Sequence, residues 1–306
     1  MDKAFEHTDV AIVGGGPAGM QAALVLARTR KKVVVFDAPE PPRNAASHGV
    51  HNFLGLDGML PAEIRKQAWQ QIDLYEHAEL RRERVTDVEH TENGEFIVTA
   101  DTSGQLLAKK VILALGYHDN HPDIDGFADA WADTIIPCPF CDGYENRDRI
   151  WGVVANFDFE ATHFPKMVQN WTKHIKIIMN DPSIELEPSF EQEMMDMNIP
   201  IHRGVITSIK QADGKVQSVT LDTGERINVE TLLWSPPEEQ SPLVTKLIAK
   251  FDLALNDMGY LKTDESQETN IPGLYAAGDV QGWSGGIEAA TAGGMAAFMI
   301  THNWYG

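Results

Sequence analysis

Short apolar runs alternate with longer segments of helical periodicity along this chain. The apolar run DVAIV at 9–13 precedes GGGPAGMQAALVLARTR, where Ala, Leu and Val recur at helical spacing. A second apolar run, KKVVVFD, follows and ends at Asp37. The same order of strand, turn, helix and strand returns from residue 150 onward. This pattern predicts an α/β fold that begins with a Rossmann-like dinucleotide-binding domain.

A glycine-rich turn lies between the first predicted strand and the first predicted helix. Its spacing, Gly14-x-Gly16-x-x-Gly19, is weak evidence alone, but strand and helix stand where the dinucleotide fingerprint requires them. The helix N-terminus then faces a pyrophosphate. Asp37, about twenty residues further on, can accept both ribose hydroxyls. Because an acid there disfavours a 2′-phosphate, we expect FAD or NAD rather than NADP.

The C-terminal segment is predicted to return to this first domain. TNIPGLYAAGDVQGW places Gly278 and Asp279 at a strand end, and small residues at helical spacing follow. The aspartate can bind the ribitol chain of a flavin, and the next helix can point its positive end at the flavin pyrimidine. We therefore expect a split FAD-binding domain at 1–117 and 246–306, with an NADPH-domain-like unit inserted at 118–245.

Composition and charge exclude several classes of protein. Hydrophobic residues make up 43% of the chain, enough for packed cores, and no apolar run approaches the roughly twenty residues of a membrane span. The N-terminal sequence has no signal-peptide pattern, so a cytoplasmic location is expected. The formal charge of −20 would repel nucleic acid, so we expect no nucleic-acid partner.

The two cysteines of the chain stand three apart in PCPFCDGYE, 137–145. With no second C-x-x-C and no H-x-x-x-H, the four ligands of a structural zinc site are missing, and no metal site is predicted. Redox chemistry is favoured over chance proximity. Only a thiolate attacks a disulfide or the flavin C4a carbon, so Cys138 and Cys141 need a proton acceptor. Asp142 is the candidate, and it could also cap a helix.

The chain resembles the low-molecular-weight thioredoxin reductases, and this resemblance implies an α/β fold with two Rossmann-like dinucleotide-binding domains. The likeness runs from GGGPAG through RNAASHGVHNFLGLDG (43–58), VILALG and C-x-x-C-D-G to PGLYAAGD. It implies a homodimer that associates through the FAD domain. It also implies that Asn52 reaches the flavin, the Val85 backbone the adenine and the Ile287 amide the pyrimidine. The expected cofactor-binding residues are Gly14, Gly16, Pro17, Ala18, Gly19, Asp37, Arg43, Asn52, Val85, Gly116, Gly278, Asp279 and Ile287.

The resemblance also implies roles at the cysteines. Cys141 would face the flavin as the charge-transfer thiolate, Cys138 would exchange with the substrate through a mixed disulfide, and Asp142 would be the acid/base. Four histidines, His48, His51, His118 and His121, lie in segments expected near the flavin or the hinge. Any of them could be an extra base, and the sequence does not select one.

The second nucleotide fingerprint of this family is missing. With IWGVV as the strand, Ala155, Phe157 and Glu160 stand where three small residues should be. Phe157 would block backbone approach, and Glu160 would place a carboxylate where a pyrophosphate should lie. Asn180 and Asp181 replace the arginine-rich turn that would bind a 2′-phosphate. NADPH is therefore not expected to bind in the usual way.

Two other features depart from the family pattern or suggest a ligand. LLWSPPEEQ (232–240) replaces an apolar strand that ends in glycine. Aromatic residues could line a pocket for a second flavin, although such residues more often form core. They are Trp151, Phe157, Phe159 and Trp234.

These observations favour an FAD-dependent thiol/disulfide oxidoreductase that works without NADPH, in the direction of dithiol oxidation. A small dithiol or a thioredoxin-like protein would be the partner. A ferredoxin-dependent reductase is an alternative that needs a basic docking patch, for which RTRKK (28–32) and RRER (81–84) are candidates. An NADPH-dependent thioredoxin reductase and a flavin redox sensor without turnover are further alternatives.

Overall fold

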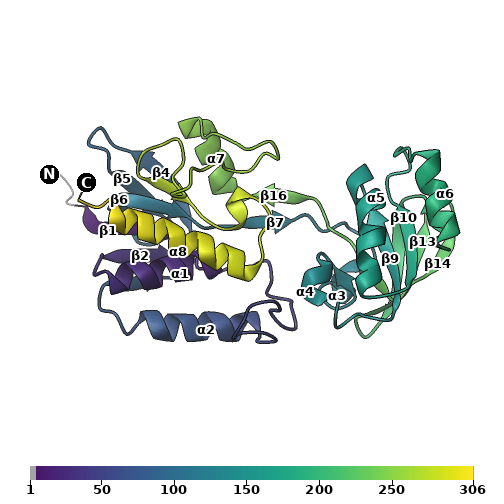
Figure 1. Cartoon of the computed structure of the whole chain (residues 1–306). Helices are drawn as coiled ribbons and strands as arrows, with labels where there is room; N and C mark the ends of the chain where they lie inside the picture. The colour runs from purple at the N-terminus through teal and green to yellow at the C-terminus, as the bar shows by residue number, and fades with distance from the viewer. Residues whose placement is uncertain (1–4, 306) are drawn as a thin grey trace. The chain divides into compact units, whose positions relative to one another are not determined.

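The computed structural model describes residues 5–305 and divides them into two compact units. The first unit comprises residues 5–45, 59–118 and 238–305, and the second comprises 46–58 and 119–237. Each unit has its own central sheet with helices packed on it (Figure 1). Both are Rossmann-like, which confirms the predicted α/β fold with two such units.

The first unit contains a largely parallel sheet. Its strands are β1 (Glu6–Val13), β2 (Val33–Phe36), β3 (Ala78–Arg81), β4 (Val85–His90), β5 (Phe96–Ala100), β6 (Gly104–Leu113) and β17 (Leu274–Ala276). They lie in the order β3-β2-β1-β6-β5-β4, with β17 paired to β6. The pairs between β1, β2, β3, β6 and β17 are parallel, whereas β4 and β5 are antiparallel to their neighbours.

Both faces of this sheet are buried. Successive residues of β1 point to opposite faces, so Val10 and Ile12 belong to one core cluster and Ala11 and Val13 to the other. A strand covered on both faces is apolar throughout, which explains the uninterrupted run in the sequence. The covering helices are α1 (Pro17–Arg28), α2 (Pro61–Ile72), α7 (Pro242–Phe251) and α8 (Gly286–His302).

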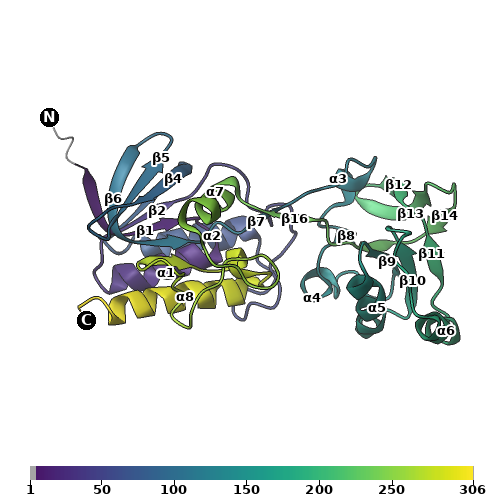
Figure 2. The same cartoon turned by 90° about the horizontal axis from the view of Figure 1, so that it is seen from above.

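The first and last helices of the unit, α1 and α8, lie side by side (Figures 1 and 2). Their approach depends on Gly293, where an added Cβ would lie 1.9 Å from the backbone oxygen of Ala18. At the next residue, Gly294, the nearest atom to an added Cβ is Cγ of Gln21, at 3.4 Å. One position is therefore restricted to glycine by packing, and its neighbour is not.

The second unit has a fully parallel five-stranded sheet beside a small antiparallel one. The parallel strands are β8 (Ile135–Ile136), β9 (Ile150–Ala155), β10 (His174–Met179), β11 (Ile201–Arg203) and β15 (Thr231–Leu233). Their order is β11-β10-β9-β15-β8. The antiparallel strands are β12 (Ile206–Ala212), β13 (Lys215–Leu221) and β14 (Arg226–Asn228).

Short helices complete the second unit. They are α3 (Phe127–Ala130), α4 (Pro139–Asp142), α5 (Asp158–Met167) and α6 (Pro188–Asp196). Two further strands, β7 (Tyr117–Asp119) and β16 (Glu238–Gln240), form a separate two-stranded sheet. Among residues 5–305, no helix has both the length and the apolar character that a membrane span requires.

We predict that Gly293→Ala lowers the free energy of unfolding by about 1–3 kcal/mol, because the added methyl group pushes α8 away from α1. Gly294→Ala is the matched control. It should leave stability unchanged or raise it by up to about 1 kcal/mol through helix propensity. Urea denaturation of both variants measures the difference, and equal stabilities would contradict the packing described here.

Candidate active site

A backbone turn at the start of α1 forms the first nucleotide site. Gly14 has a φ of +115°, and its N–H donates to the carbonyl of Phe36 at 2.8 Å. A Cβ at Gly14 would lie 2.1 Å from the Ala114 oxygen, and one at Gly19 would lie 1.9 Å from the Gly14 oxygen. At Gly16, by contrast, an added Cβ would meet nothing within 4 Å. The turn is therefore packed tightly from behind and open in front of Gly16.

The open front of this turn fits a pyrophosphate. Helix α1 begins at Pro17 with Gly16 as its N-cap, and no described side chain caps its first turn. Helix N–H groups without a partner attract an anion at that end. Pro17 and Ala18 form the first helical residues, as predicted for the cofactor-binding segment.

Asp37 follows β2 directly and is buried, with 6% of its surface exposed. Its Oδ2 pairs with the guanidinium groups of Arg65, on α2, and Arg82, just after β3. Neither arginine was predicted, because both contacts join residues far apart in the sequence. The two ion pairs fix the carboxylate at the end of β2, where the fingerprint places the ribose of the cofactor.

The returning segment brings Asp279 into the first unit. Gly278 has a φ of +79°, which favours glycine, and Asp279 follows it in the short 3₁₀ helix Asp279–Gln281. The Asp279 carboxylate accepts a hydrogen bond from the Ser284 hydroxyl at 2.6 Å. Helix α8 begins beyond it with no side-chain cap, and Ile287 lies in its first turn. These features fit the ribitol and pyrimidine contacts expected of a flavin.

Arg43 links this segment to the strand that the sequence singled out as unusual. Its guanidinium lies 2.5 Å from the Glu238 carboxylate and 3.9 Å from that of Asp279, and it stacks over the Tyr117 ring at 4.5 Å. The role of Glu238 was not predicted. Glu238 belongs to the PPEEQ segment, which lacks the glycine that the family has there. Its ion pair with Arg43 explains why an acidic residue stands in this segment.

The remaining predicted residues lie in three places. Val85 is the buried first residue of β4, and Gly116, with a φ of +69°, directly precedes β7. Asn52 lies in the 46–58 segment of the second unit, with a φ of 59°. Its side-chain amide donates a hydrogen bond to the carbonyl of Phe140, between the two cysteines. The contact of Asn52 with a flavin stays a prediction.

The cysteines lie at the start of α4. Cys138 is the N-cap residue and is 4% exposed, whereas Cys141, in the helix, is half-buried. The pKa of the Cys138 thiol lies below its usual value, chiefly because it is hydrogen-bonded with the Cys141 thiol. The N–H groups of Cys141 and Phe140 act in the same direction, while burial opposes them. Cys138 is therefore the thiol that the local geometry activates as a nucleophile.

Asp142 ends the same helix. Burial, helped by the nearby Glu145 carboxylate, raises the pKa of its carboxyl group to about 6. His51 and His48 oppose this shift. A carboxyl group that titrates near neutral pH can both take and return a thiol proton, so the geometry suits the acid/base role predicted for Asp142.

The second unit holds a carboxylate where a nucleotide fold leaves room for phosphate. Glu160 lies in the first turn of α5 with none of its surface exposed. It accepts a hydrogen bond from the Asn156 N–H at 2.7 Å. Asn156 in turn accepts a bond from the Asn180 amide at 2.9 Å, and the Asn180 oxygen accepts the Ile206 N–H at 2.8 Å. Burial raises the pKa of Glu160 to about 7.

The residues at this turn do not fit a dinucleotide. Phe157 is the N-cap of α5, with 53% of its surface exposed, so a ring stands where a phosphate would approach. Asp181 keeps a pKa below its usual value through hydrogen bonds from Ser183, so it carries a negative charge at neutral pH. The inward position of Glu160 and its bond to Asn156 were not predicted. The one sequence feature that could have indicated this hydrogen bond is that Asn156 and Glu160 stand four residues apart.

The hypothesis of one aromatic pocket in the second unit is wrong. Trp151 and Trp234 are both buried, but they belong to different core clusters. Phe157 and Phe159 are about half exposed. Since β9 carries Trp151 and β15 precedes Trp234, the strand alternation sends the two indoles into separate cores.

A family model described as pyridine nucleotide-disulphide oxidoreductase matches residues 8–150 and 166–297. This chain belongs to that family. Thioredoxin reductase aclD of Aspergillus oryzae is 30% identical to this oxidoreductase over 282 residues, 89% of this chain and 88% of the relative.

Solved structures agree with this assignment. The protein TrxB from Bacillus anthracis has a TM-score of 0.89 at 28% identity, over 97% of this chain and 98% of that one. An oxidoreductase from Agrobacterium tumefaciens has a TM-score of 0.85 at 30% identity, over 97% of both chains. The protein is an FAD-dependent disulfide oxidoreductase of the thioredoxin reductase family.

We predict that Asp142→Asn slows thiol–disulfide exchange in this oxidoreductase by roughly 100-fold. The variant should also lose the change in rate near pH 6 that the titration of Asp142 gives the wild type. Stopped-flow mixing with dithiothreitol across pH 5–9 measures both effects. Asp148→Asn, an exposed acid nearby, is the control and should behave as the wild type. An unchanged pH profile in Asp142→Asn would exclude the role.

We predict that Glu160→Gln stabilises the enzyme at alkaline pH. Because the folded-state pKa of Glu160, about 7, lies above its ordinary 4.5, folding favours the protonated form. Stability is therefore full at acid pH and falls as the pH rises from 4.5 through 7. The glutamine variant lacks this loss, so it should exceed the wild type by up to about 3 kcal/mol at pH 8 and match it near pH 4.

Asp158→Asn is the matched control for Glu160→Gln, because Asp158 is exposed in the same helical turn. Its difference from the wild type should not depend on pH. Urea denaturation at several pH values provides the measurement. A pH-independent difference for Glu160→Gln would mean that the carboxylate is solvated.

Proposed function

We propose that this enzyme passes electrons between its flavin and the Cys138–Cys141 pair without NADPH, and that it works in the direction of dithiol oxidation. The observation that carries the proposal is the burial of Glu160 under the first turn of α5. Its carboxylate accepts the backbone N–H that a pyrophosphate would need, at 2.7 Å. A second anion at the same helix end would meet both charge repulsion and occupied donors.

A break in the family match falls at the same turn. The match covers residues 8–150 and resumes at 166, so residues 151–165 lie outside it. That stretch contains the β9–α5 turn with Phe157 and Glu160. The segment that departs from the family pattern is thus the one on which a nicotinamide dinucleotide depends.

The oxidation uses the cysteines as the electron relay, and the bound flavin supplies a two-electron acceptor. A substrate thiolate attacks Cys138 of the Cys138–Cys141 disulfide, a mixed disulfide forms, and the Cys141 sulfur leaves as a thiolate. The second substrate thiolate then attacks the substrate sulfur of the mixed disulfide. The substrate disulfide closes, and Cys138 leaves as a thiolate that the N–H groups of Phe140 and Cys141 stabilise.

The cysteine disulfide must then be restored. We propose that Cys141 faces the flavin, that the two cysteine sulfurs lose two electrons and rejoin, and that oxygen or another acceptor finally takes the electrons. The name of a relative, a thioredoxin reductase, supports a thioredoxin-like protein as the partner. A small dithiol could take part in the same thiol–disulfide exchange. A homodimer that associates through the FAD-binding unit stays an expectation from the family.

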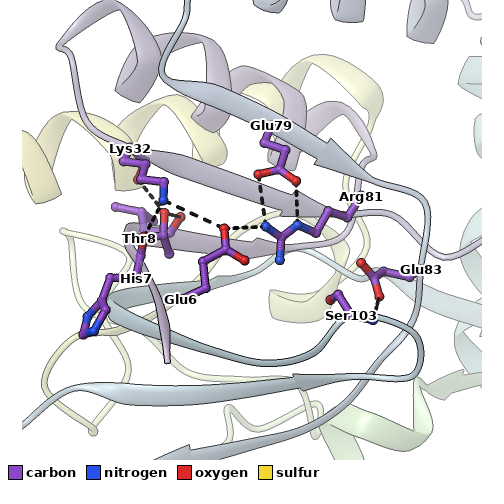
Figure 3. Close-up of polar contacts among 9 residues, drawn as sticks. Glu6, His7, Thr8, Lys32, Glu79, Arg81, Glu83 and Ser103 are labelled. Atoms are coloured by element: carbon purple, nitrogen blue, oxygen red, sulfur yellow. Dashed lines mark hydrogen bonds and ion pairs between the residues drawn. The ribbon is translucent and has the colours of Figure 1, made fainter. Parts of the chain in front are cut away.

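A ferredoxin-dependent reductase is less well supported, because internal contacts occupy the two basic runs. Figure 3 shows Arg81 paired with Glu79 and Glu6, and Lys32 beside Glu6. The guanidinium of Arg81 lies 2.7 Å from each of the two carboxylates. Arg82 pairs with Asp37 and Arg84 with Glu40. The 81–84 run would therefore present little net positive charge to an acidic protein, on a chain of charge −20.

We predict that, without oxygen, dithiothreitol bleaches the visible absorbance of the flavin and NADPH does not, and that air restores the colour. Cys138→Ser is the control and should resist bleaching by dithiothreitol. Flavin extraction should give a single FAD per chain, and a second flavin would appear in the same measurement. Rapid bleaching by NADPH would overturn the proposal and restore an ordinary thioredoxin reductase.

A further inference from the structure

A histidine lies between two carboxylates beside the redox turn. His51 belongs to the 46–58 segment, which packs in the same compact unit as the cysteines. Its Nδ1 lies 3.7 Å from the Asp57 carboxylate, and its Nε2 lies 3.7 Å from the Glu145 carboxylate. The side chain keeps 23% of its surface exposed, so protons can reach it from solvent.

The segment that carries His51 is fixed to the turn between the cysteines. The neighbouring Asn52 donates its side-chain hydrogen bond to the carbonyl of Phe140. The Asn52 backbone N–H donates to Asp57 at 2.9 Å, and the Gly58 N–H donates to the Val50 carbonyl at 2.8 Å. The ring is therefore held in one place relative to the redox turn.

Thiol–disulfide exchange requires two proton acceptors. When a dithiol reduces the Cys138–Cys141 disulfide, one substrate disulfide, two cysteine thiolates and two protons result. The carboxylate of Asp142 holds one proton. If Cys141 stays a thiolate toward the flavin, the second proton needs another base close to the turn. The reverse reaction needs the same two groups as acids.

We propose that His51 is the second proton-transfer residue of the redox site, positioned by Glu145 and Asp57. Imidazole changes its charge between pH 5 and 8 and can take a proton from a thiol and pass it to solvent. Asp57 and Glu145 lie beside His51. Asp142 interacts electrostatically with both His51 and His48. The inference depends on exchange at Cys138–Cys141, which both directions share, and so does not depend on the absence of NADPH.

The other histidines are less suited to this role. His121 packs against the rings of Trp131 and Phe127, at 4.3 and 5.3 Å. His118 is exposed on β7, in the other unit. His48 is exposed near Asp142, and it is the one competitor that the test must separate from His51.

The test is the rate of exchange itself, measured in both directions under anaerobic conditions. Oxidised enzyme is mixed with dithiothreitol, and reduced enzyme is mixed with a chromogenic aromatic disulfide. We expect His51→Gln to slow both reactions by about 100-fold at pH 7. His118→Gln is the control and should match the wild type.

Two further variants separate proton transfer from a structural role. Added imidazole should restore at least a tenth of the wild-type rate to His51→Ala, which a misfolded turn would not allow. Glu145→Gln should shift the Asp142 titration to lower pH, because Glu145 raises the pKa of that carboxyl group.

Three results would overturn the inference. They are a rate within threefold of wild type for His51→Gln, loss without imidazole rescue for His51→Ala, and loss with rescue in His48→Ala instead. Bleaching of the wild-type flavin by NADPH would remove the proposed function and leave this inference standing.

Discussion

The burial of a single carboxylate, that of Glu160, is the constraint on which the proposed function of the second unit depends. A nucleotide fold needs the N–H groups at the start of a helix to bind a phosphate. Here the Glu160 side chain, from the first turn of α5, accepts the hydrogen bond of the Asn156 N–H just before that helix. Burying this carboxylate costs free energy, which its hydrogen bonds offset only in part, since its pKa rises. Under the proposed function, the unit keeps the Rossmann-like sheet and helices but lacks the opening on which the usual ligand depends.

With that opening closed, the chemistry of the second unit concentrates at α4. The same short helix presents an activated thiol at its start and a proton-accepting carboxyl group at its end. The 46–58 segment, distant in sequence, adds His51 and Asn52 to this helix. In the proposed mechanism, electron transfer and proton transfer use different groups in one small region, so each could be changed by mutation without the other.

The sequence was sufficient wherever the decisive contact is local. The spacing of Gly14, Gly16 and Gly19 reports a backbone turn that three glycines build themselves, and Asp37 follows from the length of the intervening helix and strand. Contacts between distant segments gave no such signal. The pairing of Asp37 with Arg65 and Arg82 and of His51 with Glu145 depends on the completed fold. The prediction of an aromatic pocket was wrong for a related reason. The presence of aromatic residues in neighbouring elements does not reveal which face of a strand each ring occupies.

The ion pairs around Arg81 lie at an open edge of the first unit's sheet, where another chain could associate. β3 ends its sheet, so its outer backbone N–H and C=O groups have no neighbouring strand within the described sheet. An edge of this kind is a template on which another chain can add a strand. Glu79 keeps half of its side chain in solvent at this edge, and a strand added there would have to desolvate its carboxylate. The pairing that neutralises the basic run thus also protects the enzyme against aggregation through its sheet edge.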